Sequence, residues 1–392
     1  MTTTFRFATQ AVHAGEAPCP ATGALDTPIY QSTTFVSASS DEMAAVYGEE
    51  KFGYMYTRYG NPTIRALELK MAALEAGEAA IATASGMAAI SSAILGYVQS
   101  GDHVVAARSL YGAAYDFLAQ KLPKFGASTT FVESTDAEGF EKCIRPNTRL
   151  IYFETPSNPV LDIIDITALS EVARSHGLPL MIDNTFASPV LQQPIASGVT
   201  VVVHSATKYL CGHGDAMGGV IVGPEPYIAT LNKNILRDFG GVISPFNAWL
   251  ILRGIHTLPL RVLAQCANAQ QIAAFLHSHP KVERVNYPGL PGHPGHATAN
   301  RQMKAFGAMI SFEVKGGYES GKKVMDRVKL FARAASLGDT RSLIVHSAST
   351  SHRAVPRDQR LAIGVTDGLV RLSIGVEAAE DLREDLDQAL AF

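Results

Sequence analysis

The chain has little cysteine, a single tryptophan and no long apolar run. Four of its 392 residues are cysteines, and they are scattered without the spacing of metal ligands. We interpret them as the reduced thiols of a cytoplasmic protein. Glycine, serine or charged residues interrupt every apolar stretch well before about 18 residues, so no membrane span is expected. Residues 1–7 lack the apolar core of a signal peptide.

The chain also carries little net charge. Its formal net charge is −3, so neither nucleic acid nor an anionic membrane is an expected partner. Hydrophobic residues make up 47% of the sequence, and a chain of this length can bury a large core in two or three domains. His293 and His296 lie in a loop rich in proline and glycine with no third ligand near, so no metal site is expected.

Apolar strands and helical patterns alternate through the middle of the chain. The sequence predicts a short strand that begins at Ala79 and ends before the Ser85-Gly86 turn, strands at 101–108, 148–154, 179–183 and 199–204, and a reversal strand at 219–223. Helices are expected to begin at residue 62 and to cover 166–176. This alternation predicts an α/β fold with a mostly parallel sheet and helices on both faces. Functional groups should then gather at the carboxyl ends of the strands.

The two ends of the chain differ from this middle region. Residues 1–60 are rich in threonine, serine, glycine and aromatic residues with little helical periodicity, which predicts an extended arm packed on a partner subunit. Residues 61–258 are expected to form the large domain, ending in an apolar helix at 245–258. Residues 259–392 combine strands and helices and are expected to form a smaller α+β domain.

Lys208 is the main candidate for a catalytic residue. It follows a strand of four valines and His204, and two hydroxyls, Ser205 and Thr207, precede it. A lysine at the mouth of a buried strand is costly unless its charge is paired or its pKa falls. Such a lysine is a nucleophile toward carbonyls, and the hydroxyls suit a phosphate, which together indicate a Schiff-base lysine for pyridoxal phosphate (PLP). The alternative is a surface lysine just past a strand end.

Other candidates stand at the expected strand ends. Asn158 and Asp183 follow two strands as Lys208 follows a third, and a protonated pyridine nitrogen would supply the cation that a buried Asp183 needs. Ser85-Gly86-Met87 opens a helix whose N-terminus suits a phosphate, although Ser85 could be a plain N-cap.

Two aromatic motifs leave their alternatives open. Tyr111 could stack on a planar ring or be ordinary packing. Arg58, among Tyr54, Tyr56 and Tyr59, could clamp an anion or form a cation–π cluster.

Five motifs resemble the Cys/Met-metabolism group of fold-type I PLP enzymes, and the resemblance covers nearly the whole chain. They are Tyr-Thr-Arg-Tyr-Gly-Asn-Pro-Thr (56–63), Ala-Ser-Gly-Met-Ala-Ala (84–89), Glu-Thr-Pro-Ser-Asn-Pro (154–159), Ile-Asp-Asn-Thr (182–185) and His-Ser-Ala-Thr-Lys-Tyr (204–209). The group includes cystathionine γ-synthase, methionine and cystathionine γ-lyases, and homoserine-ester sulfhydrylases. The resemblance implies a seven-stranded sheet, a homotetramer built from dimers, and active sites shared between subunits.

The same resemblance implies a role for each candidate. Lys208 joins the cofactor covalently, Asp183 pairs with its pyridine nitrogen, and Tyr111 stacks on its ring. The phosphate is held by Ser85, Gly86, Met87, Ser205 and Thr207, and by Tyr56 and Arg58 of a neighbouring subunit. Asn158 contacts the phenolic oxygen side, and Arg371 with Ser336 binds the substrate carboxylate. Independently, an arginine in an apolar strand needs an anion, which could also be a structural ion pair.

The resemblance implies that Lys208 removes the α-proton and that the group on Cγ is then expelled. The product is completed either by a thiol or sulfide that replaces this group, or by elimination to 2-oxobutanoate and ammonia. Lyases carry cysteine where this chain has Ala113, and glutamate where it has Arg341 in Ser-Leu-Gly-Asp-Thr-Arg-Ser-Leu (336–343). Residues 244–249 also resemble sulfhydrylases, whereas 266–270 and 369–375 resemble lyases. We therefore expect a homoserine-ester sulfhydrylase, with a γ-lyase or cystathionine γ-synthase as the alternative. Arg341 could attract a succinyl carboxylate or sulfide, or be a solvated surface residue.

Overall fold

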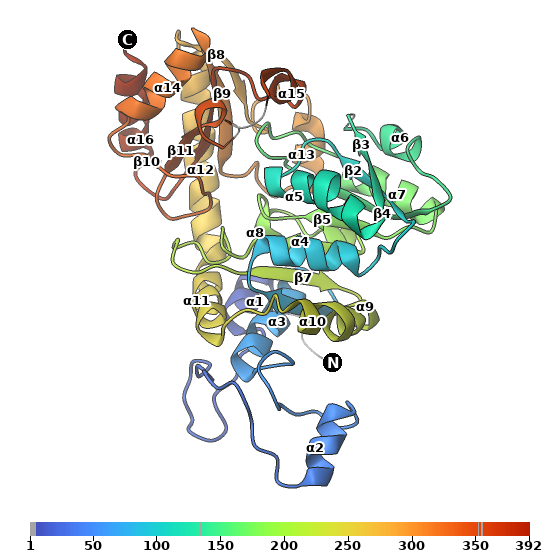
Figure 1. Ribbon diagram of the computed structural model, residues 1–392. Helices are drawn as coiled ribbons and strands as arrows, with labels where there is room; N and C mark the ends of the chain where they lie inside the picture. The colour runs from blue at the N-terminus through green and yellow to red at the C-terminus, as the bar shows by residue number, and fades with distance from the viewer. Residues whose placement is uncertain (1–4, 134, 352, 354–355) are drawn as a thin grey trace.

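A seven-stranded sheet forms the centre of the larger part of the molecule (Figure 1). The computed structural model describes residues 5–133, 135–351, 353 and 356–392. The sheet has the order β1-β7-β6-β5-β4-β2-β3. Its strands are β1 (Ala79–Thr83), β2 (His103–Ala107), β3 (Ser128–Val132), β4 (Thr148–Glu154), β5 (Leu180–Asp183), β6 (Val201–His204) and β7 (Gly219–Gly223). All neighbours are parallel except those of β7, which is antiparallel to both β1 and β6.

This sheet confirms the predicted α/β class and the reversal strand. The central strands are fully buried apolar runs, as expected for a parallel sheet covered on both faces. Strand β3 was not predicted, because its sequence Ser-Thr-Thr-Phe-Val is polar and half-buried at the edge of the sheet. An edge strand contacts only one neighbour, so its sequence needs less apolar character.

Helices pack around this sheet and begin at recognisable caps. Asn61 accepts from Thr63 N before Pro62 starts α3, and Ser85 accepts from Ala88 N at the start of α4. The α-helices of this part are α3 (Pro62–Leu74), α4 (Gly86–Leu95), α5 (Gly112–Asp116), α6 (Ala137–Glu141), α7 (Ile166–Ser175), α8 (Ser188–Leu191), α9 (Glu225–Leu231), α10 (Arg237–Phe239) and α11 (Pro245–His256). Shorter 3-10 or π-helical turns cover η1 (Phe117–Lys121), η2 (Leu122–Phe125), η3 (Pro194–Ser197) and η4 (Asn232–Leu236).

A second sheet of five strands lies toward the C-terminus, in the order β10-β11-β12-β9-β8. Its strands are β8 (Val282–Asn286), β9 (Met309–Val314), β10 (Ala332–Arg333), β11 (Leu343–His346) and β12 (Leu369–Ser373). Its helical elements are α12 (Leu258–Ser278), α13 (His296–Gln302), α14 (Gly317–Arg327), η5 (Ser347–Ser349), α15 (Arg357–Ala362) and α16 (Ala379–Leu390). Figure 1 shows the long helix α12 running from α11 up to this sheet. The division of the chain after residues 60 and 258 stays a prediction.

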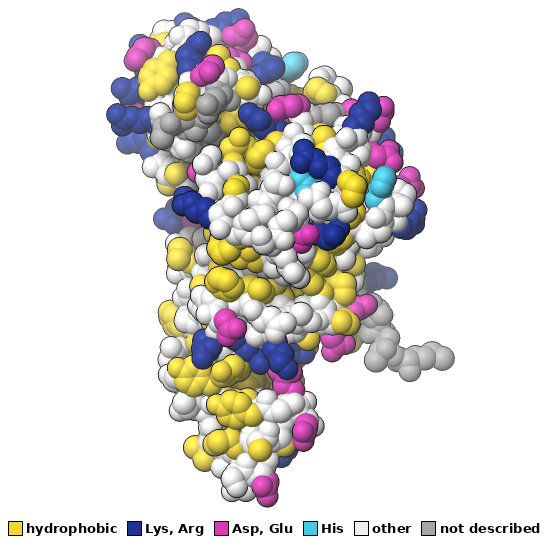
Figure 2. Space-filling model, turned by 45° about the vertical axis from the view of Figure 1, so that its right-hand side comes forward, with side chains coloured by type: hydrophobic (Ala, Val, Ile, Leu, Met, Phe, Trp, Pro, Cys, Tyr) yellow, Lys and Arg dark blue, Asp and Glu magenta, His cyan; other side chains and the backbone are white. Residues whose placement is uncertain are grey.

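Two short helices interrupt the N-terminal arm, a difference from the expected lack of helix. Helix α1 (Phe7–His13) buries Ala11 against the body, and α2 (Ser40–Tyr47) is capped by Ser39. Between them residues 27–33 are extended, as predicted. Figure 1 shows the arm projecting below the large sheet, and Figure 2 shows hydrophobic side chains gathered over that lower region.

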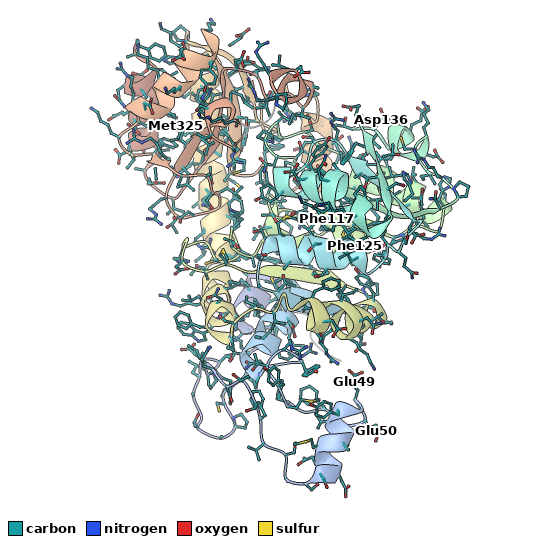
Figure 3. The ribbon with its side chains drawn as sticks, viewed as in Figure 1. Glu49, Glu50, Phe117, Phe125, Asp136 and Met325 are labelled. Carbon is teal, nitrogen blue, oxygen red and sulfur yellow. The ribbon has the colours of Figure 1, made fainter. Side chains whose placement is uncertain are left out.

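The end of α2 is tied back to the body by charge. Glu49, labelled beside Glu50 in Figure 3, pairs with Arg237 at 2.9 Å and with Lys233 at 3.6 Å. No helix in the described part of the chain is both long and apolar enough to cross a membrane.

Candidate functional site

Lys208 lies in the turn after β6, where the two sheets meet. Its Nζ donates to Ser336 Oγ at 3.0 Å, and Ser336 belongs to the segment before β11. Burial, and then the charge of Arg371, lower the pKa of Lys208. Gly338 allows this approach, because it has a φ of +74° and a Cβ there would lie 2.6 Å from Tyr209 N. The turn therefore presents a lysine whose neutral form is favoured beside a hydroxyl.

Arg371 stands on β12 facing the same place. Its Nη1 donates to Asn158 Oδ1 at 2.9 Å and its Nη2 to Ser336 O at 3.3 Å. The side chain is only 9% exposed, and it forms no ion pair within the residues that the structure describes. Burial lowers the pKa of Arg371 to about 10. A buried guanidinium with neutral partners only is costly, so this position suits an incoming carboxylate. The structural ion pair that the sequence left open is not found among these residues.

Asp183 and Glu154 end two adjacent strands and are register partners. Burial, together with the charge of Asp183, raises the pKa of Glu154 well above its usual range. Burial also raises the pKa of Asp183, while hydrogen bonds from Thr185 oppose that rise. Two buried carboxylates this close do not both ionise readily. We infer that Glu154 carries the proton and Asp183 the charge, which leaves Asp183 available to a cation.

A cup for an anion is built from the start of α4 and the end of β6. Ser85 is the N-cap of α4, the alternative role that the sequence had left open. Gly86 and Met87 lie in the first turn of this helix, where backbone N–H groups lack helical partners. A Cβ on Gly86 would lie 2.7 Å from Ser205 Cβ, so glycine lets the two elements touch. Thr207 Oγ1 donates to Gly218 O and accepts from Gly218 N, so its hydroxyl holds the glycine-rich turn.

Tyr111 and Asn158 are both positioned by Glu154. Tyr111 N donates to Glu154 Oε1 at 2.8 Å, and the backbone of Asn158 also bonds to this carboxyl. Tyr111 is 46% exposed just before α5, so its ring is open to a ligand. The segment that carries Ala113 follows within the same helix.

Tyr56 and Arg58 do not join this group within one chain. Arg58 donates to Arg237 O and lies over the rings of Tyr56, at 5.7 Å, and Tyr59, at 4.9 Å. The cation–π cluster that the sequence left open therefore exists. No contact links either residue to Lys208 in the described part of the chain, so a role at the phosphate needs a second chain.

Arg341 lies over the turn that follows Lys208. It forms a two-point pair with Asp339, with Nε to Oδ1 and Nη2 to Oδ2 both at 3.1 Å. Thr340 N donates to Gly212 O at 2.9 Å, which fixes the segment on that turn. Although the Arg341 side chain is 69% exposed, its charge is already matched by a carboxylate that is 9% exposed. Arg341 is thus less free to attract a substrate anion than its sequence position suggested.

These residues fit PLP. The phosphate cup, an unpaired buried carboxylate at Asp183 and a lysine of lowered pKa would hold its phosphate, its pyridine nitrogen and its aldehyde carbon respectively. Arg371 and Ser336 lie beside Lys208, and Arg371 has no acidic partner among the described residues, so this place suits a substrate carboxylate.

Sequence reasoning missed three supporting groups. Glu154 was noted as the end of a strand and the first residue of one family motif but was given no role, although it bonds to two candidate residues. Thr185 Oγ1 accepts from Ser205 N at 2.8 Å and ties the strand of Asp183 to the phosphate cup. His204 Nε2 pairs with the buried carboxyl of Glu75 at 2.6 Å. A buried polar residue inside an apolar strand is the one sequence signal that could have indicated His204.

Comparison with known proteins gives the family. The family model described as Cys/Met metabolism PLP-dependent enzyme matches residues 8–391. An L-methionine gamma-lyase of Fusobacterium nucleatum subsp. polymorphum is 46% identical over 384 residues, covering 97% of each chain. An O-acetyl-L-homoserine sulfhydrylase of Leptospira meyeri is 42% identical, covering 98% of this chain and 97% of the relative.

A solved structure adds the cofactor. The putative O-acetylhomoserine (thiol)-lyase of Campylobacter jejuni has a TM-score of 0.96 and 33% identity, and the match covers 99% of this chain and 100% of that one. That structure contains N'-pyridoxyl-lysine-5'-monophosphate. The chain described here therefore belongs to the Cys/Met metabolism family of PLP-dependent enzymes, which carry out replacement or elimination at Cγ of sulfur amino acids.

Proposed function

We propose that this enzyme replaces the acetyl ester of O-acetylhomoserine by sulfide and releases homocysteine and acetate. The observation that carries the substrate class is Arg371, a buried guanidinium with neutral partners beside Lys208. It would bind the α-carboxylate and so place Cα at Lys208 Nζ. The Cγ–O bond breaks and a Cγ–S bond forms.

Each residue has a task in this proposal. Lys208, Asp183 and the phosphate cup would hold PLP, which would supply an electron sink for the pair left at Cα when the proton departs. Lys208 Nζ takes the Cα proton, and its lowered pKa favours the neutral amine that can do so. Tyr111, exposed before α5, can donate a hydrogen bond to the departing acetate oxygen. Asn158 keeps Arg371 aimed at the carboxylate.

The choice of an acetyl ester rests on Arg341. A succinyl group carries a second carboxylate, and Arg341 is the cation that the sequence offered for it. Because Asp339 already matches that charge at two points, an uncharged acyl group is favoured. Ala113 also stands two residues after Tyr111, where the lyase pattern has cysteine, which separates the chain from that pattern.

The second candidate is elimination from methionine to 2-oxobutanoate, ammonia and a thiol. It is favoured by the 46% identity to an L-methionine gamma-lyase, which is higher than the 42% to the sulfhydrylase. The two candidates differ in the group that leaves Cγ, acetate or a thiol, and in whether sulfide or water completes the reaction.

Purified holoenzyme given each substrate separates them. We expect homocysteine from O-acetylhomoserine and sulfide, with a lower kcat/KM for O-succinylhomoserine. 2-Oxobutanoate from methionine without homocysteine from either ester would contradict the proposal. A preference for the succinyl ester would contradict the argument from Arg341.

A further inference from the structure

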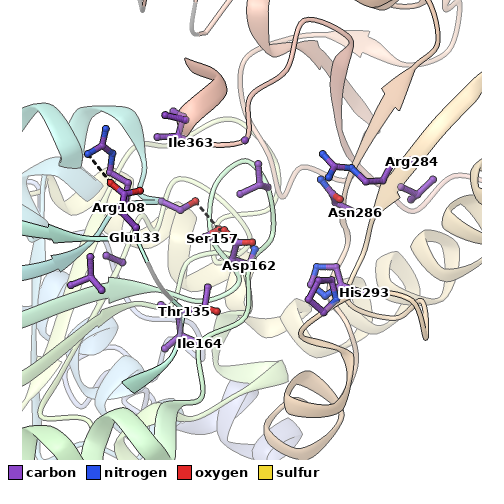
Figure 4. Close-up of a pocket in the computed structure, with 18 of the residues that line it drawn as sticks. Arg108, Glu133, Thr135, Ser157, Asp162, Ile164, Arg284, Asn286, His293 and Ile363 are labelled. Carbon is purple, nitrogen blue, oxygen red and sulfur yellow. Dashed lines mark hydrogen bonds and ion pairs between the residues drawn. The ribbon is translucent and has the colours of Figure 1, made fainter. Parts of the chain in front are cut away.

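A second cavity lies between the two parts of the chain, separate from Lys208. It has a volume of about 430 Å³, within the size range of small-molecule sites. One wall comes from the ends of β2 and β3 and the segment after β4, and the other from β8 and the loop at 292–294. Figure 4 shows Asp162 and Ser157 on the first wall and Arg284, Asn286 and His293 on the second. None of Lys208, Asp183, Ser336 or Arg371 lines it.

Asp162 brings an under-partnered carboxylate to this cavity. Burial raises its pKa, and the nearest side-chain partner of the carboxylate is Ser157 Oγ, at 3.5 Å from Oδ2. Asp162 forms no ion pair with any residue that the structure describes. A half-buried carboxylate with one long hydrogen bond is incompletely compensated, so it can accept a cationic group.

Arg284 brings the opposite charge from the other wall. Its guanidinium has one acidic partner, Glu313, at 3.6 Å, and its side chain is 56% exposed. Arg284 acts electrostatically on Asp162 without forming a salt bridge with it. The two charges therefore face each other across open space, and a ligand with both signs of charge fits between them.

The rest of the lining limits the ligand further. Arg108 and Glu133 pair with each other at 3.1 Å, so neither offers an unmatched charge. Between the charged groups the lining mixes polar side chains, such as Thr135 and Asn286, with the apolar side chains of Val160, Ile164 and Ile363. We propose that this cavity binds a free α-amino acid with an apolar side chain, its ammonium group on Asp162 and its carboxylate on Arg284.

The cavity is connected to the active site through one loop. Ser109 Oγ donates to Ser157 Oγ, and Ser157 Oγ accepts from Asp162 N. The next residue, Asn158, is the hydrogen-bond acceptor that positions Arg371. An ammonium group on Asp162 therefore acts on the segment that aims the substrate's carboxylate anchor. The bound amino acid should change the KM of the substrate more than kcat. This regulation is the same for both candidate reactions, because it acts on the carboxylate anchor and not on the leaving group or the thiol.

The test is calorimetric titration of L-norleucine into holoenzyme that has first been reduced with borohydride. Reduction fixes the cofactor on its lysine, so the probe cannot exchange with it. We expect one norleucine bound per chain, with affinity reduced roughly tenfold or more in Asp162→Asn and in Arg284→Gln, since each loses a charge-assisted contact. Arg253→Gln is the matched control, because Arg253 is exposed on α11 and does not line the cavity.

Arg371→Gln locates the binding. Unchanged norleucine affinity in Arg371→Gln, with loss in Arg284→Gln, supports the cavity as the site. Loss of binding in Arg371→Gln with retention in Asp162→Asn would place the probe in the active site and overturn the proposal. Absence of binding to the reduced parent enzyme at millimolar norleucine would overturn it as well. Because Arg284 is exposed, Arg284→Gln should fold even if Asp162→Asn does not.

Discussion

Arg371 lies near enough to Lys208 for its charge to affect the lysine. Arg371 is buried and Lys208 is half-buried, and the guanidinium of Arg371 is, after burial, the second cause of the lowered pKa of Lys208. Arg371 therefore has two effects in this site. It offers a carboxylate anchor, and it helps to keep the neighbouring amine neutral.

Arg371→Gln should expose both effects. KM for the amino acid should rise by roughly tenfold or more, because a charge-assisted pair is lost. Lys208 acts as a base only when it is neutral. Removing the nearby cation raises its pKa, so the acid limb of the kcat–pH profile should move to higher pH.

Arg253→Gln, which removes an exposed arginine on α11, should leave both readouts as in the parent. A raised KM with an unmoved acid limb would show that Arg371 does not tune the amine.

The sequence grouped Lys208, Asn158, Ser336 and Arg371, and the structure joins these four by hydrogen bonds. Glu154 could not be identified in this way. Its significance comes from contacts with Tyr111, forty-three positions before it in the chain, and from a neighbouring carboxyl on another strand. Contacts that close only on folding leave no local pattern in the sequence.

At the scale of elements, the phosphate cup depends on how closely α4 approaches β6. A Cβ at Gly86 would lie 2.7 Å from Ser205 Cβ and 2.9 Å from Ser205 Cα. Because part of this clash is with backbone, the elements would have to separate.

Gly86→Ala should therefore weaken retention of PLP, measured as cofactor absorbance remaining after dialysis, and lower stability by about 1–3 kcal/mol. Gly112→Ala is the control, since a Cβ there meets nothing within 4 Å. Equal cofactor retention in the two variants would contradict the cup.

Helix α1 is held to the body by a buried charge cluster. Lys70 is fully buried on α3 and bonds to Ala11 O at 2.9 Å and to Glu16 at 2.7 Å, while His256 of α11 also pairs with Glu16. Burial alone would raise the pKa of Glu16, but hydrogen bonds from His256 and Lys70 lower it from 4.5 to about 2. Burial lowers the pKa of Lys70, which means that its charged form is destabilised by loss of water, and the carboxylate of Glu16 offsets this effect.

Glu16→Gln should destabilise the protein by roughly 3–5 kcal/mol at neutral pH, because a buried ammonium loses its partner. In the parent, the depressed pKa means that this stabilisation is present above about pH 4.5 and is lost as pH falls toward about 2. Denaturant unfolding from pH 7 to pH 3 measures both effects, with the exposed Glu171→Gln as control. A Glu16→Gln variant as stable as the control would show that the charge cluster does not stabilise the protein.

Elements with strong periodicity were predicted well, and those without it were not. The buried strands of the sheet and helices α3 and α7 fall where their apolar patterns placed them. Helices α1 and α2 were missed because each is only about two turns long, and short helices gain their stability from tertiary contacts rather than from pattern.

At the scale of the whole molecule, the arm exposes more apolar surface than one chain covers. Leu25 is 80% exposed, Val36 100% and Phe52 77%, and Arg58 lies on the same arm away from Lys208. Several large apolar side chains exposed on one arm indicate a partner that covers them. We expect the partner to be a second copy, whose phosphate cup receives Tyr56 and Arg58.

Arg58→Ala should therefore lower PLP retention and shift the enzyme toward smaller species on dilution, followed by analytical ultracentrifugation. Lys124→Ala, a lysine exposed in η2 away from the arm, should have neither effect. Full activity in parent monomers would show that the sites are not shared.

The claim on which everything else depends is that Lys208 joins the cofactor, and reduction of the holoenzyme with borohydride followed by peptide mapping tests it most directly. We predict the pyridoxyl label on the peptide that contains Lys208, and we predict that the Lys208→Ala variant lacks the visible absorbance band of the parent enzyme. A label on any other lysine would contradict it.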